Sequence, residues 1–307
     1  MRNSFKKAIY KLMKENENIL LIVVDSGTEE CSLVRHNMPD RIIECGISEA
    51  NAIGIAAGLS SCGFVPVIYG MGAFLAYRAF EFIRDDLCIQ NRNVKIIGCG
   101  SGVGFNNLGP THHTTEDISV MTALPNMKVI SPATPLEVAN VLEIAVNHLG
   151  PFYIRFGKAF EKEVYDIAPK LEFGKANIYQ EGSDITIIST GSMLSDVIDG
   201  AEMLKQKGIS TEIINMWTLK PIDAKCIINS VKKTRKLITV EEHNSYGGLK
   251  FLVSDVLSGS DFLYKKEAIC FNDEFCTEYG WRQKIRKMYG ISAEEIFEKA
   301  YGMFKSS

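Results

Sequence analysis

Residues 41–62 read RIIECGISEANAIGIAAGLSSC, and they indicate the fold class of the whole chain. A short β-branched run over Arg41–Cys45 predicts a strand. Gly46 permits a turn after it, and Ser48 is a favourable N-cap for a helix that we expect over Ser48–Cys62. Because this helix consists mostly of small and apolar residues, it can pack closely against a neighbouring backbone. A buried strand that leads directly into a buried helix is typical of α/β proteins.

The same alternation of strand and helix continues on both sides of this stretch. The expected strands are apolar throughout, which indicates a sheet covered by helices on both faces. We therefore predict an α/β fold with a doubly wound parallel sheet. The further strands expected in this half are Ile19–Val24, Val65–Tyr69, Val94–Cys99, Lys128–Ser131 and Phe152–Phe156, and the further helices are Ser4–Lys14, Ala73–Gln90 and Pro135–His148.

A change of pattern divides the chain into two domains. Residues 158–184 are charged and contain proline and glycine, which indicates a connection with some local structure. We predict a first domain over 1–165, a linker over 166–184 and a smaller doubly wound α/β domain over 185–307. The strands expected in the second domain are Ile185–Thr190, Thr211–Trp217, Leu237–Val240 and Ala268–Phe271, and the helices are Met193–Gln206, Asp223–Val231, Gly248–Leu257, Arg282–Tyr289 and Ala293–Tyr301.

Composition and charge exclude several classes of protein. The 307 residues include 34 basic and 37 acidic side chains and no basic cluster with interleaved aromatics, so we expect no nucleic-acid partner. The longest strongly apolar run, Ile19–Val24, falls far short of the roughly 20 residues that span a bilayer, and the lysines before it are unlike a signal peptide. The eight cysteines form no C-x-x-C pair, which favours reduced thiols and a cytoplasmic protein without a membrane partner.

A glycine-rich run follows the strand expected at Val94–Cys99, but it does not match a nucleotide-binding motif. Residues 98–104 read GCGSGVG, and Val103 or Phe105 stands where G-x-G-x-x-G requires its third glycine. The chain also lacks the G-x-x-x-x-G-K-[ST] motif. We interpret the run as a flexible turn beside a cleft.

Candidate site residues follow the ends of neighbouring strands. Glu49 would occupy the first helical position, where an acidic side chain also has a purely structural role because it complements the positive end of the helix dipole. After the next strand, Phe74 and Tyr77 form part of an aromatic stripe at helical spacing, for which core packing is the usual explanation. Spacing alone leaves both alternatives open.

A Gly-Pro turn at residues 109–110 leads to His112 and His113, just before an expected helix. Adjacent histidines rarely bind one metal ion, and no cysteine or third histidine is suitably spaced, so we predict no metal site. A loop histidine at the C-terminal edge of a parallel strand is a candidate for proton transfer. Within the strand Phe152–Phe156, a buried Arg155 requires an anionic partner, either a protein carboxylate or a ligand.

In their order and spacing, these motifs resemble the transketolase family. The matching segments are G-I-S-E-A-N-A-x-G-x-A-A-G-L, Y-G-x-x-x-F, G-P-T-H-H, S-P-A-T-P-x-E and G-P-x-Y-x-R, followed in the second half by IISTGS and VEEHNSYGG. The resemblance extends over essentially all 307 residues and is closest to the C-terminal half of transketolase made as a separate subunit. It implies a pyrimidine-binding domain of the thiamine-diphosphate fold, followed by the smaller C-terminal domain of the family.

The resemblance implies thiamine diphosphate as the cofactor and assigns residues to it. Glu49 occupies the position of the glutamate that bonds N1′ of the aminopyrimidine and so promotes deprotonation of the cofactor at C2. Phe74 matches the aromatic residue that stacks on the pyrimidine, and Tyr77 is expected to help form that pocket. Asp25, at the end of the first strand, matches an acidic position near the thiamine moiety.

The same resemblance assigns substrate contacts, with two departures. His112 matches a histidine that reaches the reacting oxygens during ketol transfer, and Arg155 matches a phosphate-binding arginine. Transketolases carry an aspartate that reads a sugar hydroxyl where this chain has Leu108, and commonly a histidine where it has Gly100. When a residue that binds a sugar hydroxyl is missing, the hydroxyl itself is usually absent or differently placed in the substrate. We therefore expect the enzyme to transfer a two-carbon ketol unit on a deoxy or otherwise modified sugar.

The resemblance also implies a partner subunit. In this family a G-D-G…N motif on a separate domain holds the cofactor diphosphate through Mg²⁺, and no Gly-Asp-Gly occurs in this chain. We therefore predict an N-terminal transketolase-like subunit that carries the motif and holds Mg²⁺. The simplest closed assembly is α2β2, and the small-residue helix after Glu49 would suit a tight subunit contact.

Three alternatives remain open. A 2-oxo acid dehydrogenase beta subunit shares the architecture and the glutamate, although G-P-T-H-H differs from the Gln-His pattern of those enzymes. A second alternative is a deoxyxylulose-phosphate-synthase-like condensation with decarboxylation. A third is a non-catalytic scaffold subunit, which the intact Glu49, Phe74 and His112 disfavour.

Overall fold

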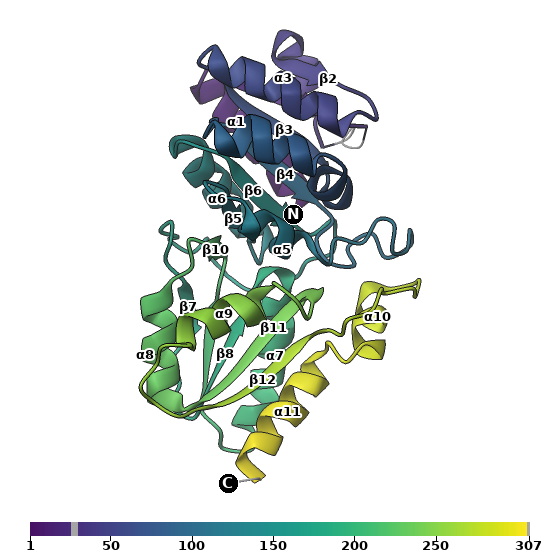
Figure 1. The fold of residues 1–307 in the computed structure, drawn as a ribbon. Coiled ribbons are helices and arrows are strands. Elements are labelled where there is room, and N and C mark those ends of the chain that lie inside the picture. The colour runs from purple at the N-terminus through teal and green to yellow at the C-terminus, as the bar shows by residue number, and fades with distance from the viewer. Residues whose placement is uncertain (26–29, 306–307) are drawn as a thin grey trace.

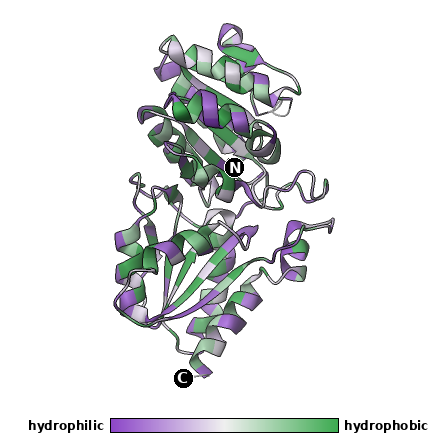
Figure 2. Cartoon of the chain, in the orientation of Figure 1, coloured by the Kyte–Doolittle hydropathy of each residue, from purple (hydrophilic) through white to green (hydrophobic). Residues whose placement is uncertain are grey.

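The chain folds into two α/β units, each built on its own sheet (Figure 1). The computed structural model describes residues 1–25 and 30–305. Within these residues the first sheet has seven strands and the second has five. Hydrophobic residues follow the central strands of both sheets (Figure 2). The predicted α/β fold with two sheet-based domains is confirmed.

The first sheet is parallel except at one edge. In spatial order its strands are β10 (Thr218–Lys220), β5 (Lys128–Ile130), β6 (Phe152–Phe156), β4 (Lys95–Cys99), β3 (Val65–Met71), β1 (Ile19–Val23) and β2 (Ile42–Glu44). Every strand predicted for this half is present within two residues at each end, because continuous apolar runs bounded by turns leave little choice of position. The exception to the parallel order is β10, which runs antiparallel to β5.

Different helices cover the two faces of the first sheet. The helices of this unit are α1 (Arg2–Glu15), α2 (Ser32–Asn37), α3 (Glu49–Ser61), α5 (Asp117–Ala123) and α6 (Pro135–Asn147), with a 3₁₀ turn η1 (Pro39–Arg41). Because successive strand residues point to opposite faces, Ile22 and Ile68 belong to the core beneath α3. Leu21 and Val67 belong to the core beneath α1 and α6.

The helix expected over Ala73–Gln90 is not a regular α-helix. It consists of a π-helical segment η2 (Phe74–Arg78), a short α4 (Phe80–Phe82) and a second π-helical segment η3 (Ile83–Ile89). A π-helix has wider turns than an α-helix and occurs frequently at functional sites. The apolar spacing predicts a helix here but does not distinguish the two types.

The second sheet is parallel except for one edge strand. Its spatial order is β12 (Lys265–Phe271), β11 (Lys236–Asn244), β8 (Ile185–Ser189), β9 (Thr211–Asn215) and β7 (Asn177–Gln180). Its helices are α7 (Leu194–Lys205), α8 (Ala224–Thr234), α9 (Leu249–Leu257), α10 (Arg282–Met288) and α11 (Ala293–Lys305), with a 3₁₀ turn η4 (Gly191–Met193). The strand β7 runs antiparallel to β9 and lies inside the segment 166–184 that we predicted as a linker.

The two units are joined by more than the connecting chain. Although β10 follows β9 in sequence, it pairs with β5 of the first sheet, in register at Thr218 and Ile130. The Lys220 ammonium donates hydrogen bonds to the carbonyls of Thr122 and Leu124, both at 2.7 Å. One apolar core runs from the first sheet to residues of β8, β9 and β11.

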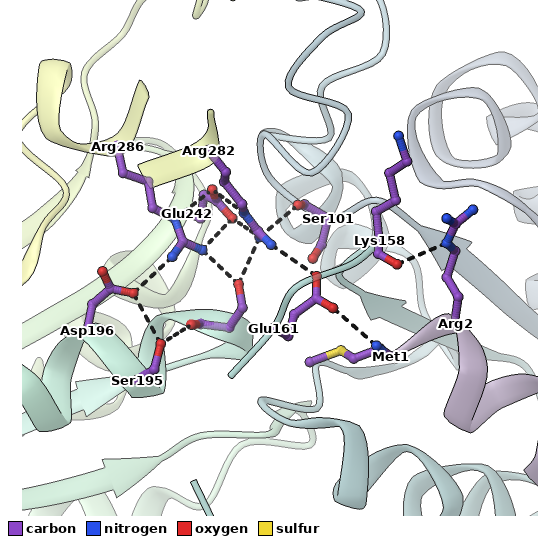
Figure 3. A network of polar contacts seen from close by, with 11 residues as sticks. Met1, Arg2, Ser101, Lys158, Glu161, Ser195, Asp196, Glu242, Arg282 and Arg286 are labelled. Carbon is purple, nitrogen blue, oxygen red and sulfur yellow. Dashed lines mark hydrogen bonds and ion pairs between the residues drawn. The ribbon is translucent and has the colours of Figure 1, made fainter. Parts of the chain in front are cut away.

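A network of charged side chains reinforces this junction (Figure 3). Glu242, on β11, accepts hydrogen bonds from Arg282 Nε at 3.0 Å and Arg286 Nε at 2.9 Å. Arg282 also reaches Glu161 at 3.2 Å and the carbonyl of Ser101 in the first unit at 3.3 Å. Burial alone would raise the pKa of Glu242, but the two guanidiniums more than offset it and hold that pKa well below its ordinary value.

Among the described residues, no helix combines the length and the apolar character that a membrane span requires. All eight cysteines are free thiols. Burial raises the pKa of the Cys99 thiol to about 11, which keeps it protonated and unreactive.

Candidate active site

The candidate site lies at the C-terminal edge of the first sheet. Parallel strands bring their C-terminal ends, and the loops that follow them, to one edge, where α/β proteins bind ligands. Asp25 follows β1, Glu49 follows β2 and Phe74 follows β3. The loop after β4 carries His112. The sheet therefore brings together segments that are up to 87 residues apart, from Asp25 to His112.

Glu49 is a buried carboxylate at the first position of α3. Its side chain is 4% exposed, and its Oε2 accepts a hydrogen bond from Arg78 Nη1 at 2.9 Å. A buried carboxylate without a hydrogen-bonding partner would be strongly unfavourable, so this contact is what the burial requires. Arg78 approaches from the solvent side, because its own side chain is 52% exposed.

The Phe74 ring lies beside both Arg78 and His112. The Cζ atom of Arg78 is 4.7 Å from the centroid of the Phe74 ring. The His112 ring meets the Phe74 ring edge to face, with centroids 5.0 Å apart, and the His112 Nδ1 is 2.9 Å from Thr111 Oγ1. Arg78 contacts both Glu49 and Phe74, and His112 contacts Phe74. The predicted residues Glu49, Phe74 and His112 therefore lie in one cluster.

Two further predicted residues, Tyr77 and Asp25, make no contact with this cluster among the contacts found in the described residues. The Tyr77 hydroxyl donates to Glu116 Oε2 at 2.9 Å and accepts a hydrogen bond from the Glu116 backbone N–H at 3.0 Å. Asp25 is exposed and adopts a left-handed backbone conformation with φ of 47°. The expected contacts of Tyr77 and Asp25 with the cofactor remain predictions.

Arg155 pairs with a protein carboxylate, which is one of the two kinds of anionic partner that we expected for this buried charge. Its Nε donates to Asp117 Oδ2 at 2.7 Å, and its Nη2 donates to the Thr114 carbonyl at 3.3 Å. The Tyr153 hydroxyl donates to the same Asp117 oxygen at 2.9 Å. Burial would lower the pKa of Arg155, but Asp117 more than compensates. Arg155 is buried and paired within the chain, and its expected contact with a substrate phosphate remains a prediction.

The two positions where transketolases carry sugar-binding residues, Gly100 and Leu108, have no polar side chain in this chain. Gly100 has φ of 86°, and a Cβ atom there would overlap the ring of Phe105, so no larger side chain fits at this position. The Phe105 ring centroid is 6.4 Å from that of His112. Leu108, in the same loop, is 43% exposed.

Two residues of this region, Arg78 and Asp117, were not expected from the sequence. Arg78 stands four residues after Phe74, so the helical spacing that placed Phe74 and Tyr77 on one face could have included it. Asp117 stands in the T-T-E-D segment after the histidine pair, which we interpreted only as the start of a helix. Both make charge pairs with residues distant in sequence, and only the folded arrangement reveals such pairs.

Two sequence models of known domains match this chain. The pyrimidine-binding domain of transketolase matches residues 1–160, and the transketolase C-terminal domain matches residues 174–296. The chain belongs to the transketolase family. Members of this family are transferases that depend on thiamine diphosphate, and the resemblance inferred from the sequence is therefore confirmed.

Several transketolase subunits are similar to this chain over nearly their whole length. An apulose-4-phosphate transketolase subunit of Actinobacillus succinogenes is 31% identical over 99% of this chain and 98% of that protein. The 6-deoxy-6-sulfo-D-fructose transketolase subunit SqwH of Clostridium sp. strain MSTE9 is 29% identical over 98% of this chain and 93% of that protein. A solved split-gene transketolase, described as an inactive beta4 tetramer, is 32% identical, with a TM-score of 0.87 over 97% of this chain and 95% of that one.

Proposed function

We propose that this chain is the C-terminal-half, or beta, subunit of a split transketolase that transfers a two-carbon ketol unit between modified sugars. The observation that carries the proposal is the cluster at the edge of the first sheet. It joins the buried Glu49 carboxylate to the Phe74 ring through Arg78, and the Phe74 ring to His112 at 5.0 Å between centroids. A passive scaffold would have no need of a buried carboxylate beside a stacking ring and an accessible histidine.

The residues of the cluster fit an aminopyrimidine. Such a ring offers a nitrogen that shares a proton with a carboxyl group and a face that stacks on an aromatic side chain. Glu49 supplies the buried carboxyl and Phe74 the stacking face, and we assign Tyr77 and Asp25 as further contacts of the cofactor. When bound, thiamine diphosphate supplies a carbon nucleophile at C2, which no protein side chain can provide. Glu49 promotes that chemistry by holding the proton at the ring nitrogen.

His112 acts on the sugar. Its ring is partly exposed in the loop after β4 and contacts Thr111 through Nδ1 at 2.9 Å, which leaves Nε2 to face a substrate oxygen. An imidazole in this position moves a proton to or from the reacting oxygens as the carbon–carbon bond forms or breaks. Its neighbour His113 is buried, and burial lowers the pKa of His113, so the two histidines have different environments.

The substrate is a modified rather than an ordinary sugar phosphate. The Phe105 ring lies 6.4 Å from that of His112 and Leu108 stands in the same loop, whereas a site that binds a sugar hydroxyl would need polar side chains. The two similar subunits named above act, by their names, on apulose 4-phosphate and on 6-deoxy-6-sulfo-D-fructose. Both facts support a specialised ketol transfer outside the exchange of common pentose phosphates.

A partner subunit completes the enzyme. Among the described residues, no group of three or more His, Cys, Asp or Glu side chains is placed to hold a metal ion, and the sequence has no Gly-Asp-Gly. We assign Mg²⁺ and the cofactor diphosphate to an N-terminal transketolase-like subunit, in an α2β2 assembly. We also assign the enzyme to the cytoplasm, in keeping with its free thiols.

The test is Glu49→Gln in the assembled complex with its partner subunit. Because glutamine cannot take up or release the proton, we expect ketol transfer to fall by about 10²- to 10⁴-fold while the complex still assembles. Glu143→Gln, an exposed substitution on α6, is the matched control and should leave turnover unchanged. Thiamine-independent turnover, or full activity of the Glu49→Gln complex, would contradict the proposal.

A further inference from the structure

We propose that Arg78 is a positioning residue that holds the Glu49 carboxylate and the Phe74 ring in the arrangement that the cofactor requires. The inference rests on the proposed function, because it concerns the residues assigned there to the aminopyrimidine. Arg78 itself does not act on substrate or cofactor. It acts through the two side chains that it contacts.

One guanidinium makes both contacts at once. Its Nη1 donates to Glu49 Oε2 at 2.9 Å, while its Cζ lies 4.7 Å from the centroid of the Phe74 ring. A planar guanidinium can donate hydrogen bonds in its plane and stack on an aromatic ring through its face. A lysine ammonium, which is a compact point charge, can replace the charge but not this geometry. The relative position of Glu49 and Phe74 therefore depends on the shape of Arg78 as well as on its charge.

The local backbone explains how the contacts arise. Phe74 and Arg78 are the first and last residues of the π-helical segment η2, which packs on α3, the helix that begins with Glu49. Residues four apart lie on the same side of a helix, so the ring and the guanidinium face the same neighbour. Such π-helical turns are found frequently at functional sites.

The contact on Glu49 leaves the other carboxylate oxygen for the cofactor. Arg78 engages Oε2, and among the described residues no other hydrogen bond to this carboxylate is found. A carboxylate held by one oxygen keeps its rotamer and presents Oε1 in a constant direction, which is what proton sharing with a ring nitrogen needs. The Glu49 side chain is 4% exposed and the Arg78 side chain is 52% exposed. The ion pair therefore joins a buried carboxylate to a guanidinium at the protein surface.

The experiment compares Arg78→Met and Arg78→Lys with the wild-type complex, including the partner subunit. Two properties are measured without substrate: the dissociation constant for thiamine diphosphate with Mg²⁺, by calorimetry, and the rate of hydrogen–deuterium exchange at C2 of the bound cofactor, by NMR. The control is Arg84→Met, because Arg84 is 56% exposed, forms its ion pair with the adjacent Asp85 and lies in the neighbouring segment η3.

We expect Arg78→Met to slow C2 exchange by about tenfold or more, as for the loss of a charge-assisted hydrogen bond, and to weaken cofactor binding by a smaller factor. Arg78→Lys should recover less than half of the lost exchange rate, because it restores the charge without the planar contact. Arg84→Met should match the wild-type complex in both measurements, and all variants should keep the wild-type melting temperature within a few degrees.

Three results would overturn the inference. They are an unchanged exchange rate in Arg78→Met, full recovery by Arg78→Lys, and tighter cofactor binding by Arg78→Met, which would mean that the guanidinium occupies the place of the ring. Failure of the proposed function gives a different result: the wild-type complex would then bind no thiamine diphosphate, or Glu49→Gln would exchange at the wild-type rate.

Discussion

If His112 acts on the sugar as proposed, the residues around it select the substrate. Phe105 fills the space above Gly100, and Leu108 stands exposed in the same loop. Apolar side chains tolerate a carbon–hydrogen group but leave a buried hydroxyl without a partner, which disfavours hydroxylated substrates. We therefore expect the preference for modified sugars to arise because no polar side chain is available at these positions to bind a sugar hydroxyl.

Leu108→Asp should shift this specificity toward ordinary sugars. An aspartate can accept a hydrogen bond from a sugar hydroxyl, so we expect kcat/KM for a pentose phosphate to rise by about tenfold relative to kcat/KM for a deoxy sugar phosphate. The measurement is steady-state turnover of the assembled complex with each sugar. Leu149→Asp, at an 80% exposed position before β6, introduces the same charge at the opposite edge of the sheet and should change neither value. Equal ratios in the two variants would refute the assignment of Leu108 to the substrate site.

Single residues also show how far the sequence can be interpreted. The cost of a buried charge predicted that Arg155 has an anionic partner, and the structure supplies one. The identity of that partner could not be predicted, because Asp117 is 38 residues away and comes from a different segment. The motif order, in contrast, selected Glu49, Phe74 and His112, which lie in one cluster, and their roles remain predictions.

At the scale of helices and strands, the sequence predicted the positions of strands that are continuous apolar runs. Two strands were missed for different reasons. The edge strand β7, with sequence NIYQ, is polar and half-exposed, so it carries little hydrophobic signal. The strand β10 has only three residues and pairs with β5, a partner some 90 residues earlier in the chain, which no local pattern can indicate.

Helix α6 carries a buried acid that links the two units. Glu137 accepts hydrogen bonds from the Ala133 backbone N–H at 2.6 Å and from Asn215 Nδ2, on β9, at 2.7 Å. Burial raises the pKa of Glu137 from 4.5 to about 7, although these hydrogen bonds act in the opposite direction. In the folded chain this carboxyl therefore keeps its proton in a range of pH where the unfolded chain releases it.

The pH dependence of stability should reveal this acid. Because the pKa of Glu137 is higher in the folded state, its contribution to stability is lost as pH rises from about 4.5 to 7. Glu137→Gln cannot titrate. Its amide can donate to Asn215 Oδ1 if the Asn215 amide turns over, because Asn215 Nδ2 faces this side chain and Oδ1 lacks a partner among the described residues. We expect the free energy of unfolding of Glu137→Gln, relative to wild type, to improve by about 2 kcal/mol between pH 5 and pH 8.

Denaturant unfolding at the two pH values measures this difference directly. Glu143→Gln, on the exposed side of the same helix, is the control for a change of charge on α6. A difference that does not depend on pH would show that Glu137 is ionised in the folded chain throughout.

At the scale of the whole molecule, the two units pack against each other beside the candidate site. The pairing of β10 with β5, the shared apolar core and the Glu242 network all connect the second unit to the first. The candidate site supplies a carboxylate, a stacking ring and a histidine, but no described cluster of oxygen ligands for a metal ion. A diphosphate bridged by Mg²⁺ needs several such ligands, which is the reason for assigning that part of the proposed site to a partner subunit.

Activity should therefore depend on a second chain. The purified chain alone should show no ketol transfer, because the proposed site binds the pyrimidine but not the diphosphate. Adding a transketolase-like partner that contains Gly-Asp-Gly should restore turnover and tighten binding of thiamine diphosphate with Mg²⁺ by about 100-fold or more. Calorimetry and turnover assays with and without the partner test this, and a partner in which the aspartate of Gly-Asp-Gly is replaced by asparagine is the control. Turnover by the chain alone would contradict the division of the site between two chains, since the metal would then have to be held by residues of this chain.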